Sequence, residues 1–182
     1  TQIREKDGVE ALSVLDFNLL IEKIKTEIKT RPVTGLRQAL HFVLPGESCS
    51  FAGKLPKVIP AAVFGRVNGV KRMKVYNGIV ELTVGPLAGK VEVDLVKKKA
   101  AELPQTMFAY MGASGNSVKI WTLFTRPDGT LPQTQEEAEI FYSHAYRLAV
   151  KCYQPQIPFD IQLKEPVLEQ YSRLSHDPEP FY

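Results

Sequence analysis

The sequence predicts an α+β fold of two layers, in which helices cover one face of a mixed β-sheet. Strand-like and helical stretches alternate from residue 58 to residue 152. Asn68-Gly69, the dipeptide most typical of a type I′ turn, joins two of the strand-like stretches. Hydrophobic residues make up 44% of the 182 residues, which is enough to fill a core. We therefore expect a single domain over residues 1–182.

Residues 1–50 are expected to form a helical amino-terminal extension of this domain. Asp16 is a candidate N-cap, and apolar residues recur at helical spacing after it. This first helix should end near Thr30, because the backbone before Pro32 disfavours the helical conformation. A second short helix is expected over residues 34–44.

The middle of the chain reads as strands separated by a helix. A β-hairpin is expected from residues 58–66 and 71–84, and alternation in its second arm places Glu81 and Thr83 on one face. The elements expected after it are a helix over residues 90–103, strands over residues 107–111 and 118–125, and a helix that begins after Thr134.

The last helix carries the clearest start signal, a capping box formed by Thr134 and Glu137. Residues 154–182 contain five prolines and no long period, so they should wrap around the body with one short strand near Arg173. The apolar stripe of the helix is expected to consist of Ala138, Phe141, Ala145, Leu148, Ala149 and Cys152.

Net charge, cysteine and histidine spacing, and the length of apolar runs limit the classes of protein to which this chain can belong. The net charge of +3 permits a polyanionic partner without requiring one. Cys49 and Cys152 form no CxxC pair, and the histidines lack zinc-ligand spacing, which argues against structural zinc. No apolar run reaches membrane-spanning length, so we expect a cytoplasmic protein without a membrane partner. Because the chain begins with Thr1, we expect it to be cut from a longer protein.

A small polar turn is the first candidate for ligand binding. Ser114, Gly115 and Asn116 allow a close backbone approach and offer amide and hydroxyl donors to a phosphate. Lys119 adds a positive charge close by. The alternative is an ordinary hairpin turn, since Ser, Gly and Asn are the usual turn residues.

Five short motifs follow one another at residues 55–64, 76–82, 112–120, 144–146 and 172–178. In this order and spacing the chain resembles the VirE amino-terminal domain family of bacterial mobile-element and plasmid-like proteins. That family looks like a divergent branch of the archaeo-eukaryotic primase superfamily, so the resemblance implies an RRM-like, primase-polymerase-like core. In that superfamily an acidic pair and a third acid hold divalent metal, and a histidine after a small-residue turn contacts the nucleotide phosphate.

The resemblance assigns site residues in this sequence. The first acid falls on Glu81, whereas the second falls on the neutral Thr83. The histidine position falls on Lys119, which can meet a phosphate as a point charge. The third acid falls on Glu165, with Asp160 and Asp177 as rivals. Glu81, Lys119 and Glu165 are thus the implied catalytic residues, and Glu81 and Glu165 are the implied ligands of Mg²⁺ or Mn²⁺.

Each of these charges has a simpler interpretation as a solvated side chain on a strand or loop. Arg173 joins the turn and Lys119 as a candidate nucleotide contact, because a guanidinium suits phosphate oxygens, but it could equally pair with Asp177. Tyr76, Tyr110 and Trp121 would stack on bases if exposed and would belong to the core otherwise. Candidate backbone contacts to nucleic acid are Lys71, Arg72, Lys74, Lys97, Lys98 and Lys99.

Two hypotheses from different classes follow. The first is a primase-polymerase-like domain of a mobile-element replication protein, which binds nucleoside triphosphate and single-stranded or primer-template DNA on its sheet face with reduced catalysis. The second is a catalytically silent module that binds nucleic acid, or another protein, for an adjoining carboxy-terminal ATPase domain. The missing second acid and Lys119 motivate the second hypothesis. Between the two, we favour primase-like ancestry with reduced or absent catalysis, and the enzyme class stays open.

Overall fold

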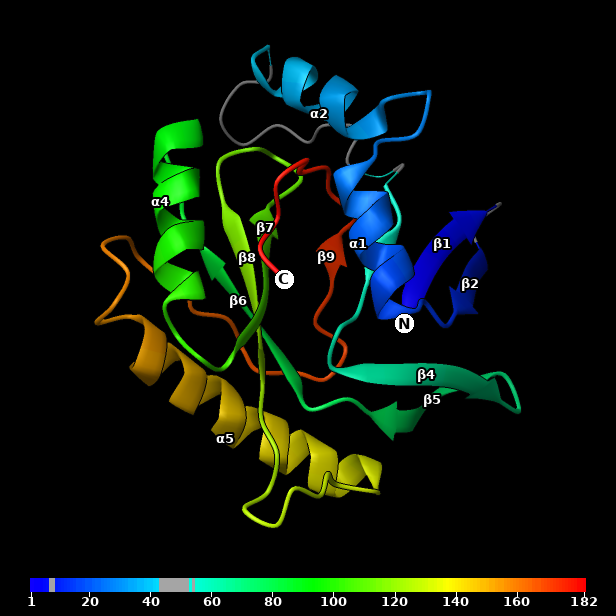
Figure 1. The fold of residues 1–182 in the computed structure, drawn as a ribbon. Coiled ribbons are helices and arrows are strands. Elements are labelled where there is room, and N and C mark those ends of the chain that lie inside the picture. Colours follow the sequence, from blue (N-terminus) through cyan, green and yellow to red (C-terminus); the bar gives the residue numbers. More distant parts are fainter. Residues whose placement is uncertain (7–8, 43–52, 54) are drawn as a thin grey trace.

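The computed structural model describes residues 1–6, 9–42, 53 and 55–182 (Figure 1). Three sheets and the helices around them make up the described chain, which confirms the α+β class. The helices are α1 (Phe17–Lys25), α2 (Pro32–Leu40), α4 (Lys90–Ala101) and α5 (Gln135–Tyr153). The first sheet has the strand order β2 (Val9–Ser13), β1 (Gln2–Lys6), β3 (Lys57–Val58) and β9 (Ser172–Arg173). The second is the pair β4 (Ala62–Val67) and β5 (Val70–Tyr76). The third, the central sheet, has the order β6 (Ile79–Val84), β8 (Val118–Leu123) and β7 (Thr106–Met111).

The central sheet is antiparallel, in contrast to the mixed sheet expected from the order of elements. From the order strand, helix, strand, the two strands β6 and β7 would be expected to pair directly as parallel neighbours. Here β8 lies between them and pairs antiparallel with both, so no parallel pair forms among the described strands. An RRM-like identity of this core stays a prediction.

Alternation along the central strands separates two faces. Val80, Leu82 and Val84 of β6 point into the larger core, together with Val118 and Ile120 of β8. Helices α4 and α5 pack on this face. The expected layer of helices is therefore present here.

Helix α1 covers the opposite face, where only open sheet was expected. Asp16 caps this helix by accepting the N–H groups of Asn18 and Leu19. Its buried residues Leu20, Ile21 and Ile24 pack against an aromatic cluster of the sheet. That cluster consists of Phe108, Tyr110 and Trp121.

The first 50 residues are not purely helical, which corrects the expected extension. β1 and β2 form a hairpin, and β1 pairs with β3, which in turn pairs with β9 near the other end of the chain. Short strands such as β3 carry little local signal, so these long-range pairs were not readable in sequence. The predicted end of the second helix at residue 44 lies outside the described residues, and α2 ends at Leu40.

The predicted hairpin turn is present between β4 and β5. Asn68 and Gly69 both have positive φ, as a type I′ turn requires. The second arm, expected to be continuous to residue 84, is divided at Asn77 and Gly78, where Gly78 has φ +72°. β4 and β5 therefore form a separate ribbon that projects from the body (Figure 1).

Helix α5 begins as predicted, and its buried stripe agrees with the predicted one at Ala138, Ala145 and Ala149. The hydroxyl of Thr134 accepts the Glu137 N–H at 3.3 Å. Leu148 is 49% exposed and Cys152 is exposed, so neither faces the core. Tyrosines take their place because buried hydroxyls find partners, as Tyr146 does by donating to the Gln162 carbonyl. The buried stripe is Ala138, Tyr142, Ala145, Tyr146, Ala149 and Tyr153.

The last segment wraps around the body as expected and closes both edges of the central sheet. Ile161 bridges Val84 at the β6 edge, and Phe181 bridges Ala109 at the β7 edge. The predicted short strand near Arg173 is β9. No helix in the described part of the chain is long and apolar enough to cross a membrane.

Candidate functional site

The motif residues of β6 and β8 lie on one face of the central sheet. Glu81 pairs in register with Trp121, and Thr83 pairs with Lys119. Directly opposed residues of an antiparallel pair project to the same side of the sheet. The fold therefore brings Glu81, Thr83 and Lys119 together, on the face that α1 covers.

Glu81 is buried, with 4% exposure, and both of its carboxylate oxygens have protein partners. Trp121 donates its Nε1–H to Oε2 at 2.8 Å. Ser172 of β9 donates its hydroxyl to Oε1, and the ammonium of Lys119 lies 3.7 Å from the same oxygen. This carboxylate is thus enclosed by its own protein and is no solvated surface charge.

Two ammonium groups converge on the hydroxyl oxygen of Thr83. Lys119 donates to Thr83 Oγ1 at 2.9 Å, and Lys164 donates to the same atom at 3.3 Å. Burial and the neighbouring charge of Lys119 lower the pKa of Lys164. With Glu81 as the carboxylate in this group, the cluster carries more positive than negative charge, which suits an anion better than a cation.

The predicted metal ligands do not fit a divalent cation in this arrangement. Glu81 is already bound by three side chains, and Lys119 and Lys164 stand beside it. Glu165 is exposed. Among the residues that the structure describes, no group of three His, Cys, Asp or Glu side chains could hold a metal ion. A hard cation with a single engaged carboxylate and two ammonium neighbours would be poorly held.

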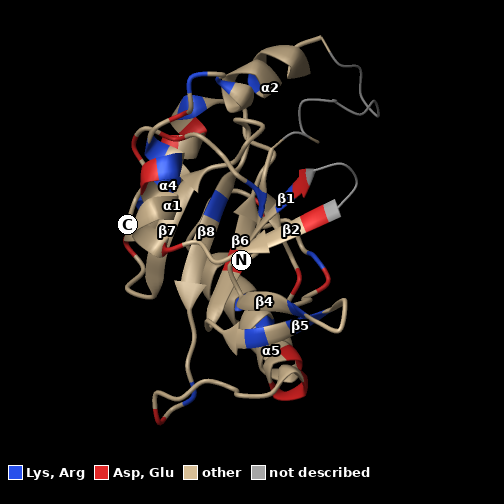
Figure 2. Ribbon diagram, turned by 90° about the vertical axis from the view of Figure 1, so that its right-hand side faces the viewer, with Lys and Arg blue, Asp and Glu red and all other residues tan. Residues whose placement is uncertain are grey.

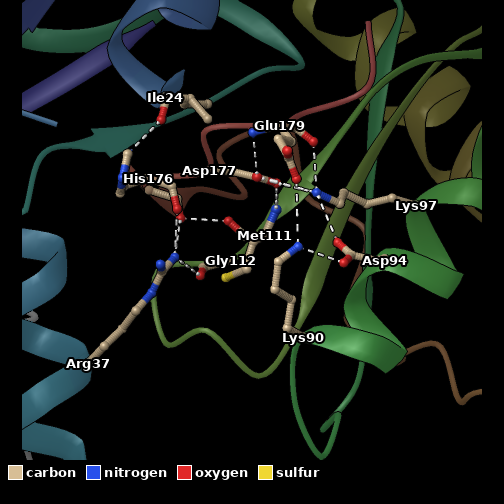
Figure 3. A network of polar contacts seen from close by, with 11 residues as sticks. Ile24, Arg37, Lys90, Asp94, Lys97, Met111, Gly112, His176, Asp177 and Glu179 are labelled. Carbon is tan, nitrogen blue, oxygen red and sulfur yellow. Dashed lines mark hydrogen bonds and ion pairs between the residues drawn. The ribbon is translucent and has the colours of Figure 1, made fainter. Parts of the chain in front are cut away.

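The rival third acids lie elsewhere. Asp160 is exposed, and its carbonyl accepts the Gly85 N–H at the edge of the sheet. Asp177 is 1% exposed and accepts hydrogen bonds from Lys97 at 3.0 Å and from the Met111 N–H at 2.8 Å (Figure 3). The Asp177 carboxylate is therefore engaged in chain packing, whereas the Asp160 side chain is exposed at the sheet edge.

The polar turn between β7 and β8 is held by Arg37 of α2. The guanidinium donates to the carbonyls of Gly112 at 3.1 Å, Ala113 at 3.2 Å and His176 at 2.7 Å (Figure 3). Within the turn, Ser114 donates its hydroxyl to the side chain of Asn116. Gly115 has φ +84°, a conformation that glycine adopts without strain. The described contacts thus give the turn a structural role, and its predicted role as a phosphate loop remains a prediction.

Arg173 lies in β9 rather than at the turn. It is half-buried and donates to the Leu55 carbonyl at 3.4 Å. Its neighbour Ser172 is the residue that reaches Glu81. Sequence reasoning missed Ser172 and Lys164, although both are adjacent to residues that it selected.

The predicted basic surface is only partly available. Lys97 is buried and paired with Asp177, and Lys99 pairs with Glu102 at 2.8 Å, so the run on α4 is not a free basic stripe. On the β4-β5 hairpin, Lys71 pairs with Glu169 at 2.5 Å, whereas Arg72 and Lys74 are exposed. Figure 2 shows positions of Lys and Arg in blue on the β4-β5 hairpin.

The candidate stacking residues belong to the core. Tyr76, Tyr110 and Trp121 are each 2% exposed. Burial and the nearby charge of Glu81 raise the pKa of Tyr110. In this conformation the aromatic face of the sheet offers no platform to a base.

Comparison with known proteins adds a family assignment. The model of the BT4734-like, N-terminal domain family matches residues 50–182. This family is related to VirE N-terminal domains, in agreement with the resemblance read from the motifs. No curated protein and no solved structure matches the chain.

Proposed function

The chain belongs to the BT4734-like N-terminal domain family, and we propose that it is a catalytically silent nucleic-acid-binding module descended from a primase-polymerase-like domain. Its role would be to bring an adjoining carboxy-terminal domain, such as an ATPase, to single-stranded or primer-template DNA. Cytoplasmic replication or mobilisation of a mobile element is the setting that the VirE relationship suggests.

The proposal has two parts, the absence of catalysis (the silent part) and the binding of nucleic acid (the nucleic-acid part). The burial of Glu81 is the observation that carries the silent part. Phosphoryl transfer needs carboxylates that can hold metal ions against the triphosphate. Ser172 and Trp121 occupy the oxygens of Glu81, and Thr83 stands where a second carboxylate is expected. A neutral hydroxyl flanked by Lys119 and Lys164 offers no second metal ligand.

The β4-β5 hairpin supports the nucleic-acid part. Residues 62–76 contain four basic side chains and no acidic one. Lys71 is neutralised by Glu169, but Arg72 and Lys74 are exposed to solvent on this hairpin, whose other face packs on the core through Phe64 and Met73. A two-stranded ribbon with exposed cations is a recurrent way to contact nucleic acid.

Fluorescence anisotropy with a labelled single-stranded DNA, measured over a range of salt concentrations, tests this proposal. The logarithm of affinity should fall against the logarithm of salt with a slope of about 0.7 for each phosphate contacted. The double variant Arg72→Ala/Lys74→Ala should reduce that slope by about one to two contacts. The matched control Lys29→Ala/Arg147→Ala removes one exposed lysine and one exposed arginine outside the candidate contacts and should leave the slope unchanged.

Two outcomes would overturn the nucleic-acid part. One is affinity that does not depend on salt, and the other is an equal loss in the hairpin and control variants. Duplex and primer-template DNA in parallel titrations identify the preferred partner.

The silent part has its own test, a titration with nucleoside triphosphate in the presence and absence of Mg²⁺ or Mn²⁺. We expect no metal-dependent binding and no primer extension. Metal-dependent binding that Glu81→Gln abolishes, in a variant that keeps its fold by circular dichroism, would instead support the primase-polymerase hypothesis.

A further inference from the structure

The outer face of α5 carries exposed apolar side chains. Ile140 is 64% exposed and Leu148 is 49% exposed. Helix α5 lies at the rim of the molecule (Figure 1), and these two side chains lie outside its buried stripe. A groove of about 440 Å³ runs between this face and the segment after β8, and it is lined by Phe124, Arg126, Glu137, Ile140, His144 and Leu148.

The residues of this face are symmetric in spacing about His144. Ile140 precedes it by four residues, and Leu148 follows it by four. Glu137 precedes it by seven residues, and Lys151 follows it by seven. These spacings keep all five side chains on one stripe of an α-helix.

We propose that α5 is the interface of a homodimer in which two copies of the helix pack antiparallel about a two-fold axis beside His144. In this arrangement Ile140 of each copy faces Leu148 of the other. Glu137 of each copy faces Lys151 of the other, so the charges are complementary at both ends. An isologous contact of this kind needs one surface that is complementary to itself, and the stripe has that property.

The distribution of charge and apolar area identifies a second copy as the occupant. Acidic residues near the start of α5 and Lys151 near its end also favour the dipole of the single helix. That dipole gives no reason for Ile140 and Leu148 to be exposed at equal distances from His144. Burial of both against a symmetry mate does, because large exposed apolar side chains are enriched at binding surfaces.

Sedimentation equilibrium across micromolar to submillimolar protein concentrations tests the proposal. A single helix pair buries a modest area, so we expect a weak dimer with a dissociation constant on the order of micromolar. Ile140→Glu and Leu148→Glu should each raise this constant at least about tenfold. Val91→Glu is the matched control, because Val91 is an apolar residue of α4 with 84% exposure and lies outside the interface. The control should dimerise like the natural chain.

Charge exchange tests the antiparallel register. Glu137→Lys and Lys151→Glu should each weaken the dimer, and the double variant Glu137→Lys/Lys151→Glu should restore it. Glu137 also pairs with Arg126 of its own chain at 3.1 Å, so circular dichroism must show that α5 is intact in each variant. A monomer at every concentration overturns the proposal. A dimer insensitive to Ile140→Glu and Leu148→Glu overturns it equally.

Discussion

At the scale of single residues, Glu81 shows how one carboxylate can hold separate parts of a fold together. It joins β6 to β8 through Trp121 and to β9 through Ser172, while Lys119 balances its charge. A buried charge of this kind is retained only when partners satisfy it. Substitution of Glu81 should therefore first affect the stability of the fold.

We expect Glu81→Ala to lower the free energy of unfolding by about 3 to 5 kcal/mol, because the substitution leaves the Lys119 ammonium without its buried counter-ion. Urea denaturation followed by the fluorescence of Trp121, the single tryptophan, measures this change. The exposed Glu165 provides the comparison, and Glu165→Ala should change stability by less than about 0.5 kcal/mol. Equal effects of the two substitutions would contradict a structural role of Glu81.

Lys164 makes a second residue-scale prediction through its titration. Its pKa is lower in the folded protein than the ordinary value of 10.5, because burial and Lys119 disfavour its charged form. The unfolded chain then binds the proton more tightly between the folded pKa and 10.5. The penalty for charging Lys164 is present at neutral pH and disappears as pH rises through that window.

The natural protein should therefore gain stability relative to Lys164→Gln as pH rises through the folded pKa toward 10.5. Urea denaturation at a series of pH values measures the difference between the two proteins. Lys98→Gln removes an exposed lysine of α4 and controls for the general loss of positive charge. A constant difference between the natural protein and Lys164→Gln would exclude the predicted linkage.

At the scale of elements, α2 begins without a conventional cap. Its N-cap residue Arg31 has φ 44° and makes no side-chain capping hydrogen bond. Glu27 takes over this function, because its carboxylate accepts the N–H groups of Val33 at 2.6 Å and Thr34 at 2.9 Å. Correct placement of α2 matters because Arg37 on this helix holds the β7-β8 turn.

We expect Glu27→Ala to cost about 1 kcal/mol at neutral pH, the usual loss when a helix cap is removed. Burial raises the pKa of Glu27, but the hydrogen bonds from Thr34 and Val33 and the charge of His176 outweigh it and hold that pKa below 4.5. The stabilisation is thus complete above 4.5 and is lost as pH falls through the folded pKa. Thermal unfolding of the natural protein and the variant between pH 7 and pH 3 should show the difference shrinking. Glu22→Ala, at an exposed position of α1, should show no such convergence.

A buried ion pair holds α4 against the last segment of the chain. Lys97 and Asp177 have side chains that are 8% and 2% exposed, and Lys97 also donates to the Glu179 carbonyl at 2.8 Å (Figure 3). We expect Asp177→Ala to destabilise the protein by about 3 to 5 kcal/mol, because it leaves the buried ammonium with only the more exposed Asp94 carboxylate, 3.5 Å away, as a counter-ion. The exposed pair Lys99 and Glu102 lies on the same helix, and Glu102→Ala should cost less than about 1 kcal/mol. If Asp177→Ala and Glu102→Ala cost similar stability in chemical denaturation, the buried pair does not hold α4 to the last segment.

Elements with a strong local signal could be predicted from sequence, and elements defined by distant partners could not. The turn at Asn68 and Gly69 and the cap at Thr134 depend on a few neighbouring residues, and both are present. β1 and β3 are stabilised by each other and by β9, so their short sequences were not informative. In α5 the tyrosines counted as polar by pattern, yet their rings were buried and the hydroxyls of Tyr146 and Tyr153 found partners.

The same limit applied to the candidate site. Pairing of β6 with β8 placed Glu81, Thr83 and Lys119 together as the motifs implied. What the motifs did not indicate was the cover, because Ser172, Lys164 and α1 reach this face from distant parts of the chain. The assignment of these side chains to catalysis depended on an open face, whereas the structure presents a closed one.

At the scale of the whole molecule, elements before residue 50 pack against the part of the chain that the family model matches. β1 extends β3, and α1 covers the aromatic cluster of the central sheet. Phe17 packs edge-on against Phe108 with ring centroids 5.4 Å apart. The part of the cover that α1 supplies thus lies outside the family match, and its removal would expose the aromatic cluster beside Glu81.

Substitutions on the two sides of α1 test whether this helix is the cover. Ile24 is 1% exposed and faces the aromatic cluster, whereas Leu19 is 51% exposed on the other side of the same helix. Ile24→Asp buries an unpaired carboxylate, so we expect a loss of more than about 3 kcal/mol and a shift of Trp121 emission to longer wavelength. Leu19→Asp makes the same chemical change at the surface and should leave both quantities nearly unchanged. Emission that stays constant in a folded Ile24→Asp variant would mean that Trp121 is shielded by something other than α1.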